Sequence, residues 1–173
     1  MSEFRYDVVG IGNAIVDVLA RADDDFLAAR DLPKGGMTLI NASTAESLYA
    51  DMTEVLEQSG GSAANTIAGL ASLGGKGAFI GKVRDDILGN SFREDIRQIG
   101  VDFDTPAATH SAPTARCLIL VTPDAQRTMN TYLGACIELG PEDIDADVIK
   151  ASKITYLEGY LFDPPAAKEA FVQ

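Results

Sequence analysis

Ser59-Gly60-Gly61-Ser62-Ala63-Ala64-Asn65-Thr66 is the stretch that decides the fold. Consecutive glycines adopt backbone conformations closed to other residues and let a ligand approach the main chain. Ser62 is predicted to be the N-cap of a helix whose apolar face continues to Leu73. A glycine turn at a helix start presents free N–H groups and the positive end of the helix dipole. The stretch therefore predicts either a binding site at the helix start or a tight loop before a closely packed helix.

Strand and helix patterns alternate on both sides of this stretch. The predicted strands are 6–12, 14–20, 37–40, 78–83, 114–122, 128–135 and 154–158. The predicted helices are 23–31, 43–58, 62–73, 86–99, a short one that begins at Pro141, and one that begins at Pro164. Alternating strands and helices with short loops are typical of a parallel α/β sheet.

One part of the chain departs from this alternation. The runs 114–122 and 128–135 flank Pro123-Asp124-Ala125-Gln126, which indicates a hairpin, and neither run is followed directly by a helix. We expect the hairpin to form a separate β-element together with 14–20 and 37–40.

Composition excludes several functions. The net charge of −12 argues against nucleic acid or an anionic membrane as the main partner. No apolar run approaches the ~20 residues that a membrane span needs. The first residues lack the basic and apolar regions of a signal peptide, so we expect a cytoplasmic protein. A hydrophobic content of 46% is ordinary for one globular domain.

Side chains suited to metal or covalent chemistry are scarce. Cys117 and Cys136 have no partner at metal-binding spacing, so we expect two buried, reduced thiols. His110 is the sole histidine and is expected at the surface, which leaves no His-based triad or zinc cluster. Asp85 and Asp86 could form a metal pair, but capping of the helix that follows is the simpler explanation. We therefore expect no metal site.

A dinucleotide-binding motif is excluded at the first strand. Gly10-x-Gly12 matches its beginning, but Ile15 stands where the third glycine belongs and no helix pattern follows. This argues against an oxidoreductase domain. Asn13 and Asp17 have the same parity, so on a strand they would share one face.

Taken together, the motifs resemble the ribokinase-type (phosphofructokinase B) family of carbohydrate and nucleoside kinases. The matching segments are Gly60-Gly61-Ser62-Ala63-Ala64-Asn65, Leu73-Gly74-Gly75, Ile80-Gly81-Lys82-Val83, Asp85-Asp86 and Gly89. In addition, 12–17 is similar to the opening motif of the adenosine-kinase branch and 127–135 to the second ribbon of the family's lid. The resemblance covers essentially all 173 residues but only the N-terminal half of a family member.

The resemblance implies an α/β fold, a doubly wound (ribokinase-like, Rossmann-type) parallel sheet with a small β-sheet lid over the acceptor site. It assigns residues 1–13, 41–105 and 140–173 to the α/β core domain, and 14–40 and 106–139 to the lid. On this interpretation the fold is incomplete at the C-terminus, where the ATP-binding half would follow.

The resemblance also implies a substrate-binding site. Seven positions match it: Asn13, Asp17, Gly60, Gly61, Asn65, Arg127 and Glu158. The first five would hold hydroxyls of the acceptor, and a carboxylate, two amides and backbone N–H groups are suited to that task. Glu158 matches a position near the sugar, and Arg127 would close from the lid toward the substrate or the transferred phosphate.

The family's catalytic base is an aspartate in a Gly-Ala-Gly-Asp motif, which this sequence lacks. We therefore expect no catalytic residue in this chain. ATP and Mg²⁺ would be bound mainly by the missing half.

Two functions stay open. One is ATP-dependent phosphorylation of a hydroxyl of a sugar or nucleoside, as by an adenosine kinase, with this chain supplying the acceptor site and lid. The other is a non-catalytic sugar- or nucleoside-binding module. Both need a small-molecule partner, whose identity the sequence does not reveal. Both faces of 116–121 carry apolar side chains. One face would cover the acceptor, and the other needs the protein's own packing or a second subunit, so a homodimer through the lid is also expected.

Overall fold

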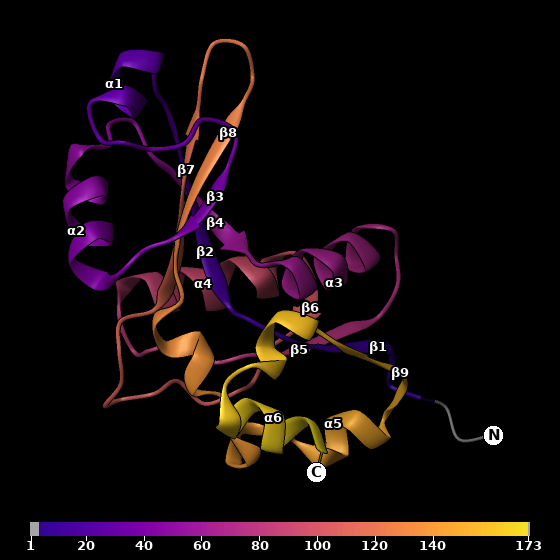
Figure 1. Cartoon of the computed structure of the whole chain (residues 1–173). Helices are drawn as coiled ribbons and strands as arrows, with labels where there is room; N and C mark the ends of the chain where they lie inside the picture. The colour runs from indigo at the N-terminus through magenta and orange to yellow at the C-terminus, as the bar shows by residue number, and fades with distance from the viewer. Residues whose placement is uncertain (1–3, 173) are drawn as a thin grey trace.

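The computed structural model describes residues 4–172, which fold into two sheets (Figure 1). The core sheet has the order β6 (Val101–Asp102), β5 (Gly77–Ile80), β1 (Tyr6–Ile11) and β9 (Ser152–Leu157). All three of its strand pairs are parallel. The predicted parallel α/β sheet is thus confirmed.

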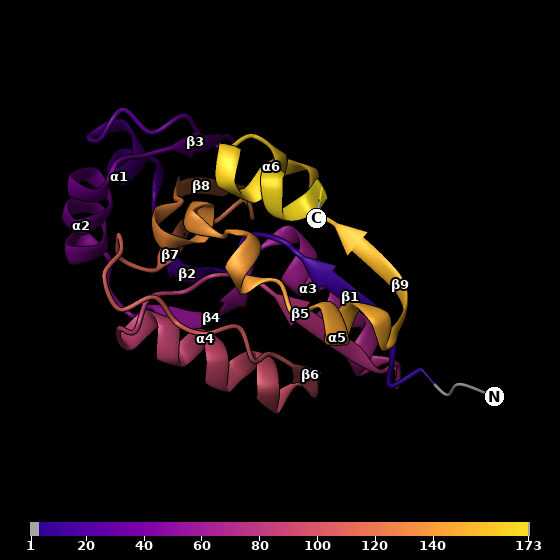
Figure 2. The ribbon, with the colours of Figure 1, turned by 90° about the horizontal axis from the view of Figure 1, so that it is seen from below.

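Helices cover both faces of the core sheet (Figures 1 and 2). On one face lie α3 (Ser62–Ser72) and α4 (Ile87–Gln98), and on the other α5 (Ala146–Lys150) and α6 (Pro165–Val172). Short 3-10 helices occur at η1 (Gly134–Glu138), η2 (Pro141–Asp143) and η3 (Gly159–Phe162). Covering helices explain why the central strands β1 and β5 are apolar on both faces.

Three fully buried aromatic rings hold α4 against the sheet. The ring centroid of Phe92 lies 6.1 Å from that of Phe79 and 5.3 Å from that of Phe103. Such pairs add about 0.5–1.5 kcal/mol each beyond the burial of apolar surface. Asp86 caps α4 as predicted, because its Oδ1 accepts the backbone N–H of Gly89 at 2.8 Å.

The second sheet is the predicted β-element. Its order is β3 (Met37–Leu39), β8 (Arg127–Tyr132), β7 (Ala115–Val121), β2 (Ile15–Arg21) and β4 (Leu56–Gly60). The pair β7–β8 is an antiparallel hairpin, which confirms the hairpin prediction. We call this sheet the lid sheet.

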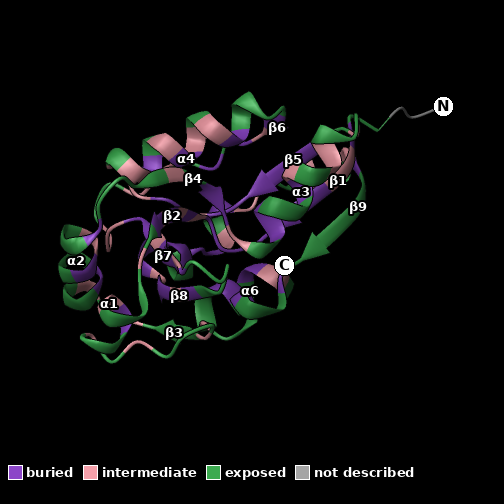
Figure 3. Cartoon of the chain, turned by 90° about the horizontal axis from the view of Figure 1, so that it is seen from above, coloured by how far each residue is buried: buried purple, intermediate pink, exposed green. Residues whose placement is uncertain are grey.

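One face of the lid sheet packs against helices of the same chain. Val18, Leu118 and Leu120 are fully buried there beneath α1 (Asp24–Ala28) and α2 (Ala42–Asp51) (Figure 3). The chain itself therefore covers one of the two apolar faces that suggested a dimer.

The predicted helix 43–58 is wrong in its second half. The helix α2 ends at Asp51, Glu54 has a positive φ of 51°, and the chain then enters β4, where Leu19 of β2 pairs with Leu56. Pairing with a strand more than 30 residues away outweighs the local helical pattern. The expected boundary between the core domain and the lid changes as well. Residues 41–105 were assigned to the core domain, but β4 lies in the lid sheet.

Two caps also differ from the prediction. Asn41, not Ser43, caps α2, since its Oδ1 accepts the backbone N–H of Thr44 at 2.9 Å. Gly61, not Ser62, is the N-cap of α3. The side chain of Ser62 is thereby free to make the contact described below.

Other predictions concern single side chains and membrane spans. Cys117 and Cys136 are buried and free, and His110 is exposed, as predicted. Among the described residues, no helix is long and apolar enough to cross a membrane. Within the same residues, no group of three or more acidic, Cys or His side chains is placed to hold a metal ion.

Candidate substrate-binding site

Gly60 and Gly61 lie where the chain passes from the last strand of the lid sheet into helix α3 of the core. Gly60 is the last residue of β4 and pairs with Ile15 of β2. A Cβ atom on Gly60 would lie 2.3 Å from Cγ of Asp17. Gly61 has a φ of +99°, and a Cβ atom there would lie 2.4 Å from the backbone oxygen of Asn13. Only glycine fits both positions, so the turn and the segment 13–17 are in direct contact.

Asp17 supplies a carboxylate beside this glycine turn. Its side chain lies against Gly60, and the side chains of Asn65 on α3 and Arg127 on β8 approach it. Burial raises the pKa of Asp17 above its ordinary value, whereas the positive charge of Arg127 and a hydrogen bond from Asn65 act in the opposite direction. Three elements that are distant in sequence thus converge on one acid.

Asn13 adds a second polar group, which is 3% exposed. Its backbone N–H donates to Glu158, but its side-chain Oδ1 is buried without a hydrogen-bond partner within the described chain. A buried oxygen without a partner costs about 1–3 kcal/mol. A donor supplied by a bound ligand would remove that cost, so Asn13 offers an acceptor at this site.

Glu158 follows β9 and is also 3% exposed. Its Oε2 accepts the backbone N–H of Asn13, and its Oε1 accepts the hydroxyl of Ser62. A Cβ atom on Gly12 would lie 2.4 Å from Oε2. Burial and, next, the negative charge of Glu158 raise the pKa of the Cys136 thiol well above its ordinary value. Glu158 therefore links the end of β9 to the start of α3 and to the β1–β2 connection.

Comparison with known proteins identifies the family. The model of the pfkB family of carbohydrate kinases matches residues 32–173. The chain belongs to this family. Its relatives include sugar and nucleoside kinases, such as the guanosine-inosine kinase of Escherichia coli K12. That protein is 28% identical over an alignment of 170 positions, which covers 89% of this chain and 37% of that protein.

Solved structures of the pfkB fold include two that are similar to this chain over nearly its whole length. The adenosine kinase of Sinorhizobium meliloti is 59% identical with a TM-score of 0.88, over 96% of this chain and 51% of that one. A probable sugar kinase of Rhizobium etli CFN 42 is 54% identical with a TM-score of 0.90, over 98% of this chain and 51% of that one. This pfkB chain therefore spans about half the length of these two proteins.

Six of the seven expected site residues lie together in this pfkB chain. Gly60 lies against the Asp17 carboxylate, the charge of Arg127 and Asn65 counteract the burial that raises the pKa of Asp17, and Asn13 and Gly61 are in contact beside it. Glu158 lies on the other side of Asn13, with both carboxylate oxygens engaged by groups of the chain. The resemblance had placed Glu158 near the sugar, whereas its recorded hydrogen bonds are internal.

Ser62, Cys117 and Thr131 also lie in this region, although the sequence did not indicate that they belong to it. Ser62 had been interpreted as a helix cap, although its hydroxyl contacts Glu158. Cys117 lies next to Asp17 across the β2–β7 pair, and Thr131 donates to its Sγ at 3.3 Å. Strand parity in 115–121 groups Cys117 with Ile119 and Val121, but only the pairing of β2 with β7 places it on the Asp17 face.

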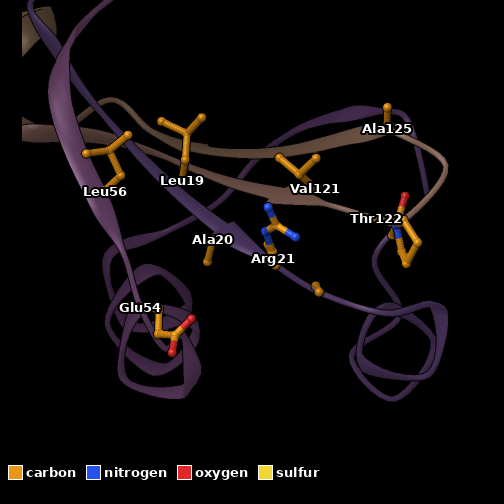
Figure 4. Close-up of a pocket in the computed structure, with 10 residues that line it drawn as sticks. Leu19, Ala20, Arg21, Glu54, Leu56, Val121, Thr122 and Ala125 are labelled. Carbon is orange, nitrogen blue, oxygen red and sulfur yellow. The ribbon is translucent and has the colours of Figure 1, made fainter.

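The face of the lid sheet that carries Asp17 is otherwise mostly apolar. By strand register it includes Ile15, Leu19, Leu56, Ile119, Met129 and Leu39. At the outer end of the sheet, a hollow of about 610 Å³ is lined by Leu19, Leu56 and Val121 (Figure 4). Leu56 is 60% exposed and Leu39 is 61% exposed. This face therefore offers uncovered apolar surface beside the polar site.

Proposed function

We propose that this chain forms the acceptor-binding site and lid of an ATP-dependent kinase for a sugar or nucleoside, of the adenosine-kinase type. The observation that carries the proposal is the Asp17 carboxylate packed against Gly60, next to the contact of Gly61 with Asn13, whose side-chain Oδ1 is buried and has no partner among the described residues. The high identity to a bacterial adenosine kinase supports it. Titration of adenosine, guanosine, ribose and fructose into the chain by calorimetry tests it, with one ligand expected to bind.

The geometry suits a ligand with neighbouring hydroxyl groups. A carboxylate can accept two hydrogen bonds from hydroxyls on adjacent carbons, and each bond to a charged group is worth about 1.5–3 kcal/mol. Asn65 can donate and accept beside Asp17, and Oδ1 of Asn13 can accept one further donor. Arg127, which is exposed on β8, adds positive charge that favours an anionic group such as a transferred phosphate.

We assign Glu158 a positioning role in this site. Its oxygens accept from Asn13 and Ser62 and hold the segment before Asp17 against the start of α3. The site then depends on Glu158 through the position of Asn13 and not through a contact with the ligand.

ATP and a divalent ion are the cofactors that the proposed reaction needs, and we propose that the second half of the kinase mainly binds them. No Gly-Ala-Gly-Asp motif is present in the sequence, and residues 4–172 contain no metal-ligating cluster. We therefore assign neither group to this chain, and its own contribution is to bind and orient the acceptor.

The first prediction is that the 173-residue chain alone transfers no phosphate. The reason is that the sequence lacks the Gly-Ala-Gly-Asp aspartate that would take the hydroxyl proton. Purified chain is incubated with ATP, Mg²⁺ and the same panel of sugars and nucleosides, and products are separated by chromatography. Turnover that co-purifies with the chain would contradict the prediction.

A non-catalytic sugar- or nucleoside-binding module is the second candidate, favoured because the polar site lies within this chain while the base motif does not. The two candidates are distinguished by mixing this chain with the second half of the Sinorhizobium meliloti adenosine kinase, ATP and the bound ligand, and by measuring phosphorylation of that ligand. Phosphorylation of a bound ligand supports the kinase. Binding without turnover, in an assembled complex, supports the module.

The second prediction concerns self-association through the lid sheet. Leu39 and Leu56 leave apolar surface exposed on the Asp17 face, so we expect a homodimer there. Replacement of Leu56 by Lys should convert the dimer to monomer in sedimentation velocity. Ile87→Lys on α4, which is 83% exposed, serves as the control and should leave the sedimentation coefficient unchanged. A monomeric wild-type chain at high concentration would rule out this interface.

A further inference from the structure

Helix α4 runs beside β4, the strand that leads into the glycine turn (Figures 2 and 3). Ser59, the residue directly before Gly60, is 8% exposed, and its backbone N–H donates to Oδ2 of Asp95 on α4 at 2.6 Å. A hydrogen bond to a carboxylate is charge-assisted and stronger than one between neutral groups. This bond joins two segments that lie 36 positions apart in the sequence.

The N–H that Asp95 accepts belongs to an edge strand. In the lid sheet β4 is the outermost strand, and Ser59 is paired with Val16 of β2. Backbone groups on the open side of an edge strand need a partner, or they attract another strand. Asp95 supplies such a partner and fixes the end of β4 to α4.

The strand on the other side of β2 is attached to α4 as well. Asp86, the N-cap of α4, accepts the backbone N–H of Thr114 at 3.0 Å and its hydroxyl at 2.7 Å. Thr114 is 1% exposed and directly precedes β7. Ile15 of β2 pairs with Gly60 on one side and with Ala115 on the other. The two attachments therefore lie at the same level of the sheet, on either side of the strand that carries Asp17.

The helix that carries Asp95 is itself fixed in the core. Phe92, about one turn before Asp95, packs against the rings of Phe79 on β5 and Phe103. Ile96, the residue after Asp95, is fully buried. A closely packed helix of this kind holds a polar side chain in a defined place.

The segment that Asp95 holds lies against the acceptor site. Gly60 is in contact with the carboxylate of Asp17, and Gly61 is in contact with the backbone oxygen of Asn13. Both glycines lie between Ser59 and the start of α3. If the bond to Ser59 is lost, the turn gains freedom to move away from Asp17 and Asn13.

We propose that Asp95 is a positioning residue of the acceptor site. Its carboxylate holds Ser59 and thereby keeps the glycine turn against Asp17 and Asn13, and it acts without touching the ligand. The effect on ligand affinity rests on the proposed function, whereas the position of the turn is measurable without a ligand.

Amide hydrogen exchange, followed by NMR, tests the hold on the turn. Asp95→Ala removes the acceptor, so the amide of Ser59 should exchange at least ~10-fold faster and the amide resonances of Gly60 and Gly61 should shift. Asp95→Asn keeps an acceptor oxygen and should restore slow exchange. Glu94→Ala, at the neighbouring exposed position of α4, is the matched control and should leave the exchange and the resonances unchanged.

Calorimetric titration with adenosine tests the consequence for binding, using variants that urea unfolding shows to be folded. Asp95→Ala should weaken adenosine binding at least ~10-fold, because small misplacements of the groups that hold a ligand are costly. Asp95→Asn and Glu94→Ala should retain the wild-type affinity. Rescue by asparagine separates a hydrogen-bonding role from a general loss of stability.

Each outcome decides a different part. Unchanged exchange of the Ser59 amide in Asp95→Ala overturns the positioning role. Faster exchange with unchanged adenosine affinity shows that the site does not depend on this bond and overturns it as well. If Asp95→Asn behaves like Asp95→Ala, the charge is required instead of an acceptor, which overturns the hydrogen-bonding role. If the exchange and the resonances change as expected but the wild type binds no adenosine, the hold on the turn is supported and the adenosine-kinase type of the proposed function is contradicted.

Discussion

Replacing Asp17 by Asn should lower the affinity for the acceptor at least ~10-fold, which corresponds to about 1.4 kcal/mol. The variant keeps the shape of the side chain but removes the charge and turns one acceptor oxygen into a donor. That donor would face the hydroxyl donors of the ligand and lie beside the side chain of Asn65. The measurement is calorimetric titration with the ligand found in the panel, using this chain and, if it assembles, its complex with the second half.

Asp24→Asn is the matched control for this prediction. The side chain of Asp24 is 71% exposed on α1, where its ion pair with Lys34 contributes little. The affinity of the Asp24→Asn variant for the ligand should equal that of the wild type. Equal affinities for the Asp17 and Asp24 variants would mean that Asp17 does not bind the acceptor.

The second large effect is expected on stability. Glu158→Leu should lower the free energy of unfolding by about 2–4 kcal/mol, because it removes two hydrogen bonds to a buried carboxylate and leaves the N–H of Asn13 without a partner. The measurement is urea unfolding followed by circular dichroism. Leucine preserves most of the buried volume, so loss of packing contributes little.

Glu94→Leu on the exposed surface of α4 is the control, and it should change the free energy of unfolding by less than about 0.5 kcal/mol. The milder variant Glu158→Gln separates positioning from binding. If Glu158 positions the site, this variant should lower stability and leave the contacts to the ligand intact in folded protein. A loss of affinity as large as that of Asp17→Asn, with unchanged stability, would contradict the positioning role.

Local patterns predicted most of the core. Strands such as β1 and β5 are short apolar runs, and α4 carries a regular apolar stripe between the Asp86 cap and Gly100, which has a φ of +97°. These signals lie within about a dozen residues, so they can be interpreted without knowledge of the fold. The pair Gly60-Gly61 was singled out in the same way, because glycine is the residue for a positive φ and close backbone contact.

The errors lie where distant segments meet. The segment 52–58 continues a helical pattern, but its residues 56–58 belong to β4 and pair with β2. Ser62 is a suitable helix cap by its position, but Gly61 is the N-cap, and the hydroxyl of Ser62 donates to a carboxylate 96 residues away. In both cases a contact that the local sequence does not encode outweighs a weak local preference.

By itself, the sequence determined the α/β class, the glycine turn at the start of α3, and the family whose motifs it carries. Only the tertiary structure decided that Asp17, Asn65 and Arg127 converge, that Glu158 is engaged by Asn13 and Ser62, and that β9 is left as an uncovered edge. The physical reason is separation along the chain. Turns and helices are set by neighbouring residues, whereas the hydrogen bond from Asn13 to Glu158 spans 145 positions and depends on the pairing of β1 with β9.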